Sequence, residues 1–160
     1  MEVTPGVLLH VHGVGLLLTG DSGSGKSDGA LALLERGHQL VADDVVEVSR
    51  TGDRLRGRAP ARLKGLLEVR GVGICPVASL FGPKALRADT VVDLAVTLET
   101  DVDWTNWPRL APLHDTVPMA GVAVPRVRLP VSPARPVALL LEVIARRHAA
   151  GTLSQEASHE

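Results

Sequence analysis

Hydrophobic residues in the first part of the chain form short runs typical of buried strands, followed by a stripe with helical spacing. We expect strands over residues 7–12 and 16–19, joined by a glycine turn, and then a glycine-rich loop. From residue 27 onward, apolar residues at 30, 31, 33 and 34 predict a helix that ends near Gly37. A further apolar run at 40–42 predicts a second buried strand. This strand–loop–helix–strand unit implies a crossover connection and a parallel pairing of its two strands.

The rest of the pattern predicts further short strands and a C-terminal helix. The expected elements are a hairpin of residues 45–48 and 54–58, segments 67–71 and 74–80 around a glycine turn, strands at 90–98 and 122–131, and a helix at 137–148. Pro125 places its strand at a sheet edge, and residues 100–118 are expected to form a long loop. We predict one α/β domain over residues 1–148, with a mainly β core and the C-terminal helix packed on it. A disordered tail is expected over residues 149–160.

Composition narrows the class of protein. The 160 residues are 45% hydrophobic and 22% charged, with a net charge of −1, as in a globular protein without the basic face of a nucleic-acid binder. Phe81, Trp104 and Trp107 are the only aromatic residues, too few for a base-stacking platform. Cys75 is the single cysteine, which excludes an intrachain disulfide and favours a reducing compartment. With no signal peptide or membrane-spanning run evident, we expect a cytoplasmic protein.

The glycine-rich loop carries the strongest chemical signal in the sequence. It matches the pattern G-x-x-x-x-G-K-[ST] and consists of Gly20, Asp21, Ser22, Gly23, Ser24, Gly25, Lys26 and Ser27. In such a loop, successive amides point toward phosphate oxygens, and the following helix contributes the positive end of its dipole. Lys26 is expected to contact the β- and γ-phosphates, and the Ser27 hydroxyl to complete a magnesium shell. The loop therefore predicts a nucleotide site.

Several acidic residues lie close to this loop in the sequence. Asp43 and Asp44 follow the second buried strand, where they are placed to touch magnesium, directly or through water, or to take the proton of a nucleophile. The alternative is a solvated acidic turn. Asp21 is expected to cap local amides, and Asp28 to lie in the first turn of the helix, where acids are favoured.

Two histidines, His10 and His12, alternate on the first strand and so share one face. Such a pair can bind a metal ion, but no third ligand is evident nearby. Surface or packing roles are therefore favoured over a metal site.

Three sequence blocks stand in a characteristic order. Gly13-Val14-Gly15 precedes the phosphate loop, residues 36–44 read RGHQLVADD, and residues 66–74 read LLEVRGVGI. These blocks resemble the catalytic domain of the HPr kinase/phosphorylase family, whose strings G-H-x-L-V-A-D-D and L-E-[IV]-R-G-[LV]-G-I are more specific than a phosphate loop. With residues 80–82 and 133–143, the resemblance covers residue 6 to about residue 147. It implies a P-loop-containing HPr kinase-like fold, in a short form without the family's separate N-terminal domain.

The resemblance also implies an activity. Members phosphorylate a serine of the phosphocarrier HPr with ATP and Mg²⁺, and reverse the reaction by phosphorolysis with inorganic phosphate. By motif, Lys26 would hold the phosphates and Ser27 would ligate the metal ion. Asp44 would accept the proton of the substrate serine, and return it in the reverse reaction, with Asp43 in support.

Further roles follow from the same resemblance. Glu68 would be a second metal ligand, Arg70 belongs to the same signature, and Arg109 falls where the family keeps an active-site arginine. An alternative for Glu68 and Arg70 is a cross-strand ion pair. The family's members are hexamers, so the resemblance also implies a homo-oligomer.

The sequence departs from the family pattern at two places. Pro5 stands where the family has a histidine immediately before Gly6, and it is left open whether His10 or His12 replaces that group. Residues 131–136 read VSPARP in place of the V-R-P-G-R-N tied to phosphorolysis, so we expect the reverse reaction to be weakened or lost. Two other functions stay open, a small-molecule kinase of the same fold and a nucleotide-binding regulatory module without turnover.

Overall fold

The structure is a computed structural model, and it describes residues 1–153. The elements in chain order are β1 (Glu2–Pro5), β2 (Val7–Val11), β3 (Val14–Gly20), α1 (Lys26–Glu35), β4 (Gln39–Ala42), β5 (Val45–Thr51), β6 (Arg54–Arg58), η1 (Ala61–Leu63), β7 (Leu66–Val69), β8 (Gly73–Pro76), α2 (Val77–Phe81), η2 (Pro83–Ala85), β9 (Asp89–Val91), β10 (Leu94–Glu99), β11 (Leu113–Met119), β12 (Val122–Pro130) and α3 (Val137–Ala149). These bounds confirm the predicted N-terminal strands, the helix after the phosphate loop, the β5–β6 hairpin and the C-terminal helix. The predicted α/β class with a mainly β core is confirmed as well.

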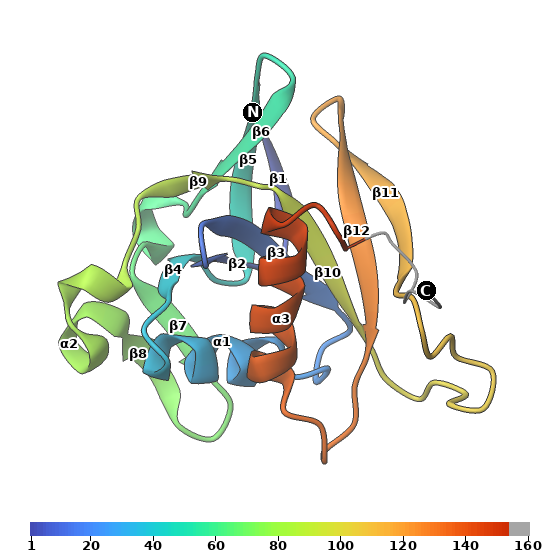
Figure 1. Ribbon diagram of the computed structural model, residues 1–160. Helices are drawn as coiled ribbons and strands as arrows, with labels where there is room; N and C mark the ends of the chain where they lie inside the picture. Colours follow the sequence, from blue (N-terminus) through green and yellow to red (C-terminus); the bar gives the residue numbers. More distant parts are fainter. Residues whose placement is uncertain (154–160) are drawn as a thin grey trace.

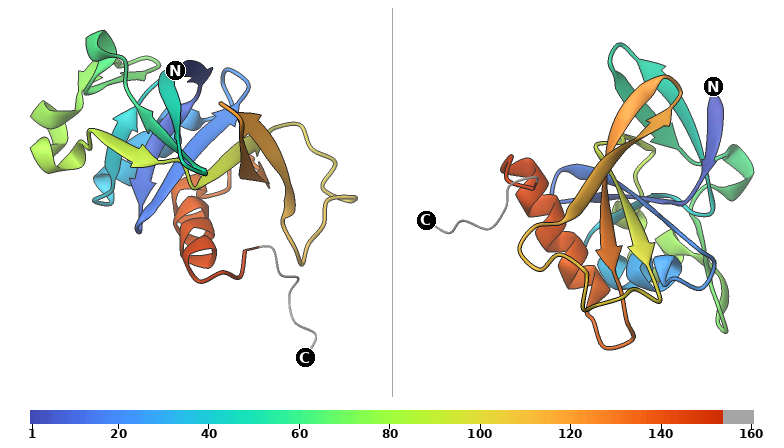
Figure 2. Two further views of the ribbon diagram at one scale, coloured as in Figure 1. Left: turned by 90° about the horizontal axis from the view of Figure 1, so that it is seen from above. Right: turned by 90° about the vertical axis from the view of Figure 1, so that its right-hand side faces the viewer.

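The six-stranded sheet lies between a layer of helices and a four-stranded sheet. Its six strands are ordered β11-β12-β10-β3-β2-β4, and a four-stranded sheet is ordered β1-β5-β6-β9. Figure 1 shows α3 in front of the six-stranded sheet with α1 beside its lower end, and Figure 2 shows the β5–β6 hairpin on the side away from α3. Leu16 and Leu18 of β3 belong to the core on the helix side, whereas Leu17 belongs to the core on the other side. Because both faces of β3 are buried, its sequence is continuously apolar.

The predicted parallel pairing of residues 16–19 with residues 40–42 is wrong. Strand β2 lies between β3 and β4 and pairs antiparallel with both. The two flanking strands therefore run in the same direction without being neighbours, and the parallel partner of β3 is β10. As a result, the carboxyl ends of β3 and β4 reach the same edge of the sheet as the start of β2.

The predicted strand over residues 90–98 is divided between two sheets. Its first part, β9, pairs with β6, and its second part, β10, lies between β3 and β12. The connection crosses β3 at Gly15, where the Asp93 amide donates to the Gly15 carbonyl at 2.9 Å and the Gly15 amide donates to Asp93 Oδ2 at 2.8 Å. A Cβ atom on Gly15 would lie only 1.7 Å from the Val91 carbonyl oxygen. The crossing therefore requires glycine at this position.

Three further predictions need correction near the C-terminus. The loop after β10 ends at residue 112, because Leu113–Met119 forms β11 against β12. Strand β12 has partners on both sides, so it is not the edge strand that Pro125 predicted. Its parallel pairing with β10 begins only at Arg126, which leaves the proline outside that ladder.

The last helix also extends past its predicted end. Helix α3 continues to Ala149, and Leu153 packs in the helix-side core, beyond the predicted boundary at residue 148. The rest of the predicted tail, residues 154–160, lies outside the described residues. Within residues 1–153, no helix is long and apolar enough to cross a membrane.

We expect Gly15→Ala to destabilise the fold, because the new methyl group would overlap the carbonyl of Val91. Overpacking of this kind costs about 1–3 kcal/mol, which corresponds to a loss of roughly 3–10 °C in Tm for a chain of this size. Differential scanning calorimetry measures the change.

Gly29→Ala is the matched control, since a Cβ there meets Val137 at an ordinary 3.5 Å. Alanine is favoured over glycine inside a helix by about 0.5–1 kcal/mol, so this variant should keep or raise the Tm. An unchanged Tm in Gly15→Ala would contradict the steric argument.

Candidate active site

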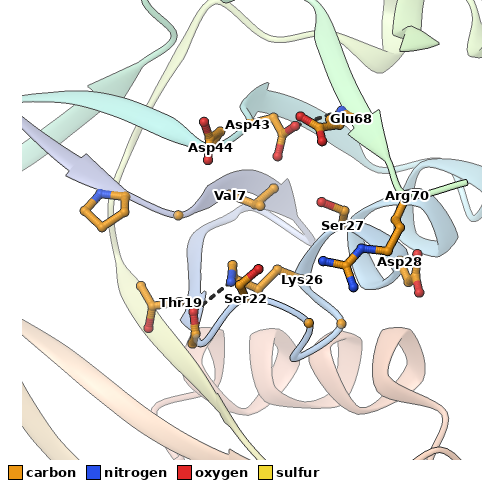
Figure 3. Close-up of a pocket in the computed structure, with 15 residues that line it drawn as sticks. Val7, Thr19, Ser22, Lys26, Ser27, Asp28, Asp43, Asp44, Glu68 and Arg70 are labelled. Atoms are coloured by element: carbon orange, nitrogen blue, oxygen red, sulfur yellow. Dashed lines mark hydrogen bonds between the residues drawn. The ribbon is translucent and has the colours of Figure 1, made fainter. Parts of the chain in front are cut away.

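A pocket of about 400 Å³ opens where β3 and β4 end and β2 begins. Figure 3 shows the acids Asp43, Asp44 and Glu68 on one side of this pocket and Lys26 with Ser22 on the other. The lining residues are Pro5, Gly6, Val7, Thr19, Gly20, Ser22, Gly23, Gly25, Lys26, Ser27, Asp28, Asp43, Asp44, Glu68 and Arg70. The pocket therefore combines an amide-rich loop with a group of carboxylates.

The loop between β3 and α1 begins with a close approach of two strands. Gly20 has φ of 139°, and a Cβ there would lie 2.8 Å from the Leu98 carbonyl oxygen. Among the described residues, the amides of Ser22, Gly23 and Gly25 make no hydrogen bond, while the Ser24 amide donates to the Asp21 carbonyl at 3.0 Å. Free amides at the start of a helix are the usual binding site for a phosphate group.

Lys26 lies in the pocket but is held by the loop itself. Its Nζ donates to the carbonyl oxygens of Gly20 at 2.7 Å and Asp21 at 3.1 Å. These bonds place the ammonium group beside the free amides, and Ser27 follows as the second residue of α1. The loop therefore offers amides, one positive charge and one hydroxyl to a bound polyphosphate.

Asp44 adopts a left-handed backbone conformation, with φ of 71°. Aspartate tolerates this region better than most residues. The turn is fixed on both sides, because the Gly6 amide donates to the Asp44 carbonyl at 3.1 Å and the Val45 amide donates to the Asp43 carbonyl at 2.8 Å. The sharp turn leaves the exposed Asp44 side chain at the pocket.

Asp43 connects the end of β4 to the β7–β8 hairpin. Its Oδ2 accepts a hydrogen bond from the Glu68 amide at 2.9 Å, and the residue is only 9% exposed. Burial raises the pKa of Asp43, and the nearby carboxylates of Asp44 and Glu68 add to the rise, while the bond from the Glu68 amide opposes it. Asp43 therefore positions the hairpin that carries two further pocket residues.

Glu68 and Arg70 reach the pocket from β7 and the turn that follows it. They are exposed and alternate with the buried side chains of Leu67 and Val69. The described residues contain no ion pair between Glu68 and Arg70, so the alternative of a cross-strand pair is not realised. The Ser27 hydroxyl and the carboxylates supply only oxygen donors, which are the ligands that Mg²⁺ prefers.

Three predicted site residues do not line the pocket. Asp21 and Ser24 belong to the loop, but they contribute through their backbone, and the Ser24 hydroxyl is buried without a partner among the described residues. Arg109 lies in a second pocket with Trp104 and Arg135, so the structure does not bring it to the carboxylates.

Several lining residues were not predicted as site residues. Pro5, Gly6 and Val7 enter because β2 begins at this edge, and Thr19 because β3 ends there. The sequence signal for this part of the pocket is the glycine at position 6. In the structure Gly6 has φ of 143°, and a Cβ there would lie 2.7 Å from the Leu18 carbonyl oxygen, so the position requires glycine. Asp28, predicted only to lie in the first turn of the helix, also lines the pocket.

Comparisons with a family model and with curated proteins point to the same family. The family model described as HPr Serine kinase C-terminal domain matches residues 1–160. An HPr kinase/phosphorylase of Alkaliphilus metalliredigens is 42% identical over 97% of this chain and 50% of that protein. An HPr kinase/phosphorylase of Levilactobacillus brevis is 44% identical over 96% of this chain and 50% of that protein. The chain thus spans about half the length of these curated relatives.

A solved structure gives the same result at the level of the fold. The Hpr(Ser) kinase/phosphatase from Coxiella burnetii matches with a TM-score of 0.86 and 34% identity, over 94% of this chain and 92% of that chain.

We expect Asp43→Asn to raise the Tm at pH 7.5 in metal-free buffer. Burial raises the pKa of Asp43 above its unfolded value, so the stability of the wild type falls as the pH rises through the folded pKa. Asparagine removes this penalty and still offers an oxygen to the Glu68 amide. The gain should disappear below about pH 3.9, where the carboxyl group is protonated in both states.

Thermal unfolding across this pH range measures the effect. Asp53→Asn, in the exposed turn between β5 and β6, is the control and should leave the Tm unchanged. A lower Tm of Asp43→Asn at pH 7.5 would show that ionised Asp43 stabilises the fold.

Proposed function

Because the chain belongs to the HPr serine kinase C-terminal domain family, we propose that it transfers the γ-phosphoryl group of ATP to a serine of an HPr-like phosphocarrier protein. One observation carries the proposal. The free amides and Lys26 lie on one side of the pocket, and Asp43, Asp44 and Glu68 lie on the other. A phosphate tail and a serine hydroxyl can therefore meet between them.

The loop would bind the nucleotide. The amides of Ser22, Gly23 and Gly25 would donate to phosphate oxygens, and Lys26 would exchange its two carbonyl acceptors for the β- and γ-phosphates. Ser27 and Glu68 would hold Mg²⁺, which neutralises charge on the transferred group. Arg70 would add a further positive charge at the pocket.

Asp44 would handle the proton of the acceptor. A serine hydroxyl loses its proton as the new P–O bond forms, so one carboxylate oxygen is a sufficient base. The proton passes from the serine oxygen to Asp44, the P–O bond to ADP breaks, and phosphoserine forms. In phosphorolysis, inorganic phosphate takes the phosphoryl group as pyrophosphate, and Asp44 returns the proton to the serine oxygen.

Oligomerisation and location belong to the same proposal. We expect a homo-oligomer, because members of the family are hexamers. Sedimentation of the purified chain measures its size. The single cysteine supports a cytoplasmic location. It cannot form an intrachain disulfide, and proteins of reducing compartments rarely contain disulfides.

We expect Asp44→Asn to lower phosphoryl transfer by about 10²- to 10⁴-fold, the usual contribution of a general base. Nucleotide affinity should be retained, because the loop is unchanged and asparagine also tolerates a left-handed backbone. Lys26→Ala should weaken both transfer and nucleotide binding. Transfer of labelled phosphate from ATP to purified HPr and calorimetry with ATP measure the two quantities.

Asp101→Asn is the matched control, since Asp101 is also exposed with φ of 54° and does not line the pocket. Its transfer rate should equal that of the wild type. Undiminished transfer in Asp44→Asn would remove Asp44 from the catalytic role. ATP binding without transfer to any acceptor would favour a regulatory module, and transfer only to small molecules would favour a small-molecule kinase.

We further expect phosphorolysis to be much slower than the kinase reaction. Pro5 lines the pocket next to Gly6, whose amide binds the Asp44 backbone, so no imidazole stands at that position. His10 does not replace it, because its Nδ1 is 3.1 Å from Thr90 Oγ1, and neither His10 nor His12 lines the pocket. Arg135 belongs to the altered segment 131–136. It donates to the Pro130 carbonyl at 2.7 Å and lines the second pocket, not the active-site pocket.

Pyrophosphate release from serine-phosphorylated HPr tests this expectation. Pro5→His should raise the ratio of phosphorolysis to kinase activity, because it restores a titratable group beside Asp44. A reverse rate comparable with the kinase rate in the unmodified chain would contradict the expectation.

A further inference from the structure

A second group of metal-ligating side chains lies outside the active-site pocket. His12 is in the turn between β2 and β3, His38 lies between α1 and β4, and Glu142 is in α3. One potential ligand atom from each residue falls within 4.8 Å of the others. Three separate elements therefore bring two imidazoles and a carboxylate to one place.

The turn that carries His12 explains why the sequence did not reveal this group. Val11 pairs with Val14, so His12 and Gly13 form a two-residue turn with φ of 49° and 78°, as in a type I′ hairpin. The turn separates His12 from His10, which instead contacts Thr90. The predicted shared face of the two histidines is therefore wrong, and the partners of His12 come from distant parts of the chain.

Glu142 has one carboxylate oxygen for each side of the cluster. Arg36 Nε donates to Oε1 at 2.8 Å, and Arg36 Nη2 forms an ion pair with the same oxygen at 2.6 Å. Oε2 lies 2.7 Å from His38 Nε2 and 3.9 Å from His12 Nε2. A guanidinium that orients the far oxygen of a ligating carboxylate is a common outer-shell arrangement. Oε2 is thus left to face the two imidazoles.

Positive charge also surrounds the cluster. Arg36 Nη2 lies 2.6 Å from Glu142 Oε1, and Arg146 follows Glu142 by one turn in α3. A metal ion would bind Glu142 as an ionised carboxylate and the two histidines as neutral imidazoles.

His12 is the member of the cluster without another evident role. His38, Glu142 and Arg36 form a hydrogen-bonded ion-pair network that joins α1 to α3. Among residues 1–153, His12 makes no hydrogen bond, and its ring and that of His38 form a T-shaped contact with 4.7 Å between centroids. Its side chain is 28% exposed, so solvent reaches the imidazole. In a tetrahedral site the ligand atoms would stand about 3.4 Å apart, so His12 would move closer to Glu142 and His38 slightly further from it.

We propose that His12, His38 and Glu142 form a binding site for Zn²⁺ or a similar borderline divalent ion, with the fourth position open to water. Two imidazoles and one carboxylate are a known ligand set for zinc with an open position. The positive charges of Arg36 and Arg146 oppose the ion, so the affinity should be moderate rather than that of a structural zinc finger. The site joins the β2–β3 turn, the end of α1 and α3, about 15 Å along α1 from the phosphate loop.

Calorimetric titration of the untagged, metal-free 160-residue chain with ZnCl₂ tests the proposal. Millimolar MgCl₂ is present throughout to occupy oxygen-rich sites at the active-site pocket. We expect one equivalent of Zn²⁺ to bind and to raise the Tm, because the ion binds the folded chain. Co²⁺ in its place should give the visible absorption bands of a four-coordinate site.

His12→Asn is the decisive variant, because asparagine keeps the left-handed turn and removes the imidazole. Zn²⁺ affinity should fall at least about tenfold, since loss of an outer-shell partner alone costs about 10- to 100-fold. His114→Ala removes an exposed imidazole elsewhere and should leave the affinity unchanged. Equal Zn²⁺ binding by His12→Asn and wild type, or no Zn²⁺ binding by wild type, would overturn the proposal.

Discussion

The position of β3 is the constraint on which the rest of the structure depends. This strand is paired on both edges, with β2 and β10, and buried on both faces. Its carboxyl end is therefore fixed, and the chain must turn there into a loop in which the amides of Ser22, Gly23 and Gly25 find no partner within the described part of the protein. Unpaired amides are unfavourable unless water or a ligand satisfies them. The buried strand thus fixes the loop to which the proposed function assigns phosphate binding.

The acids reach this site through the antiparallel insertion of β2. Because β2 lies between β3 and β4, residue Gly6 and the pair Asp43 and Asp44 come to the edge where β3 ends. The bond from the Glu68 amide to Asp43 then adds the β7–β8 hairpin. Burial of Asp43 works against stability at neutral pH, as its raised pKa indicates. A destabilising group that positions others is typical of a functional site.

Local features of this protein could be predicted from the sequence, whereas long-range placement could not. The loop 20–27 and the helix after it depend on neighbouring residues, so their pattern was sufficient. The insertion of β2, the split of residues 90–98 at Gly15 and the second pocket around Arg109 depend on contacts between distant segments. The separation of His12 from His10 was also missed. Strand alternation predicts one shared face, but the two-residue turn begins at His12 and reverses the chain direction.

Helix α1 links the two groups of charged side chains. Its N-terminus faces the pocket, where the partial positive charge of the helix favours phosphate. Its C-terminus leads to Arg36 and His38, which bind Glu142 at the end where positive charge is favoured. A cation held by His12, His38 and Glu142 would lie at that same negative end. Buried Leu33 and Leu34 pack the helix on the core between the two sites, so both sites depend on the placement of the same helix.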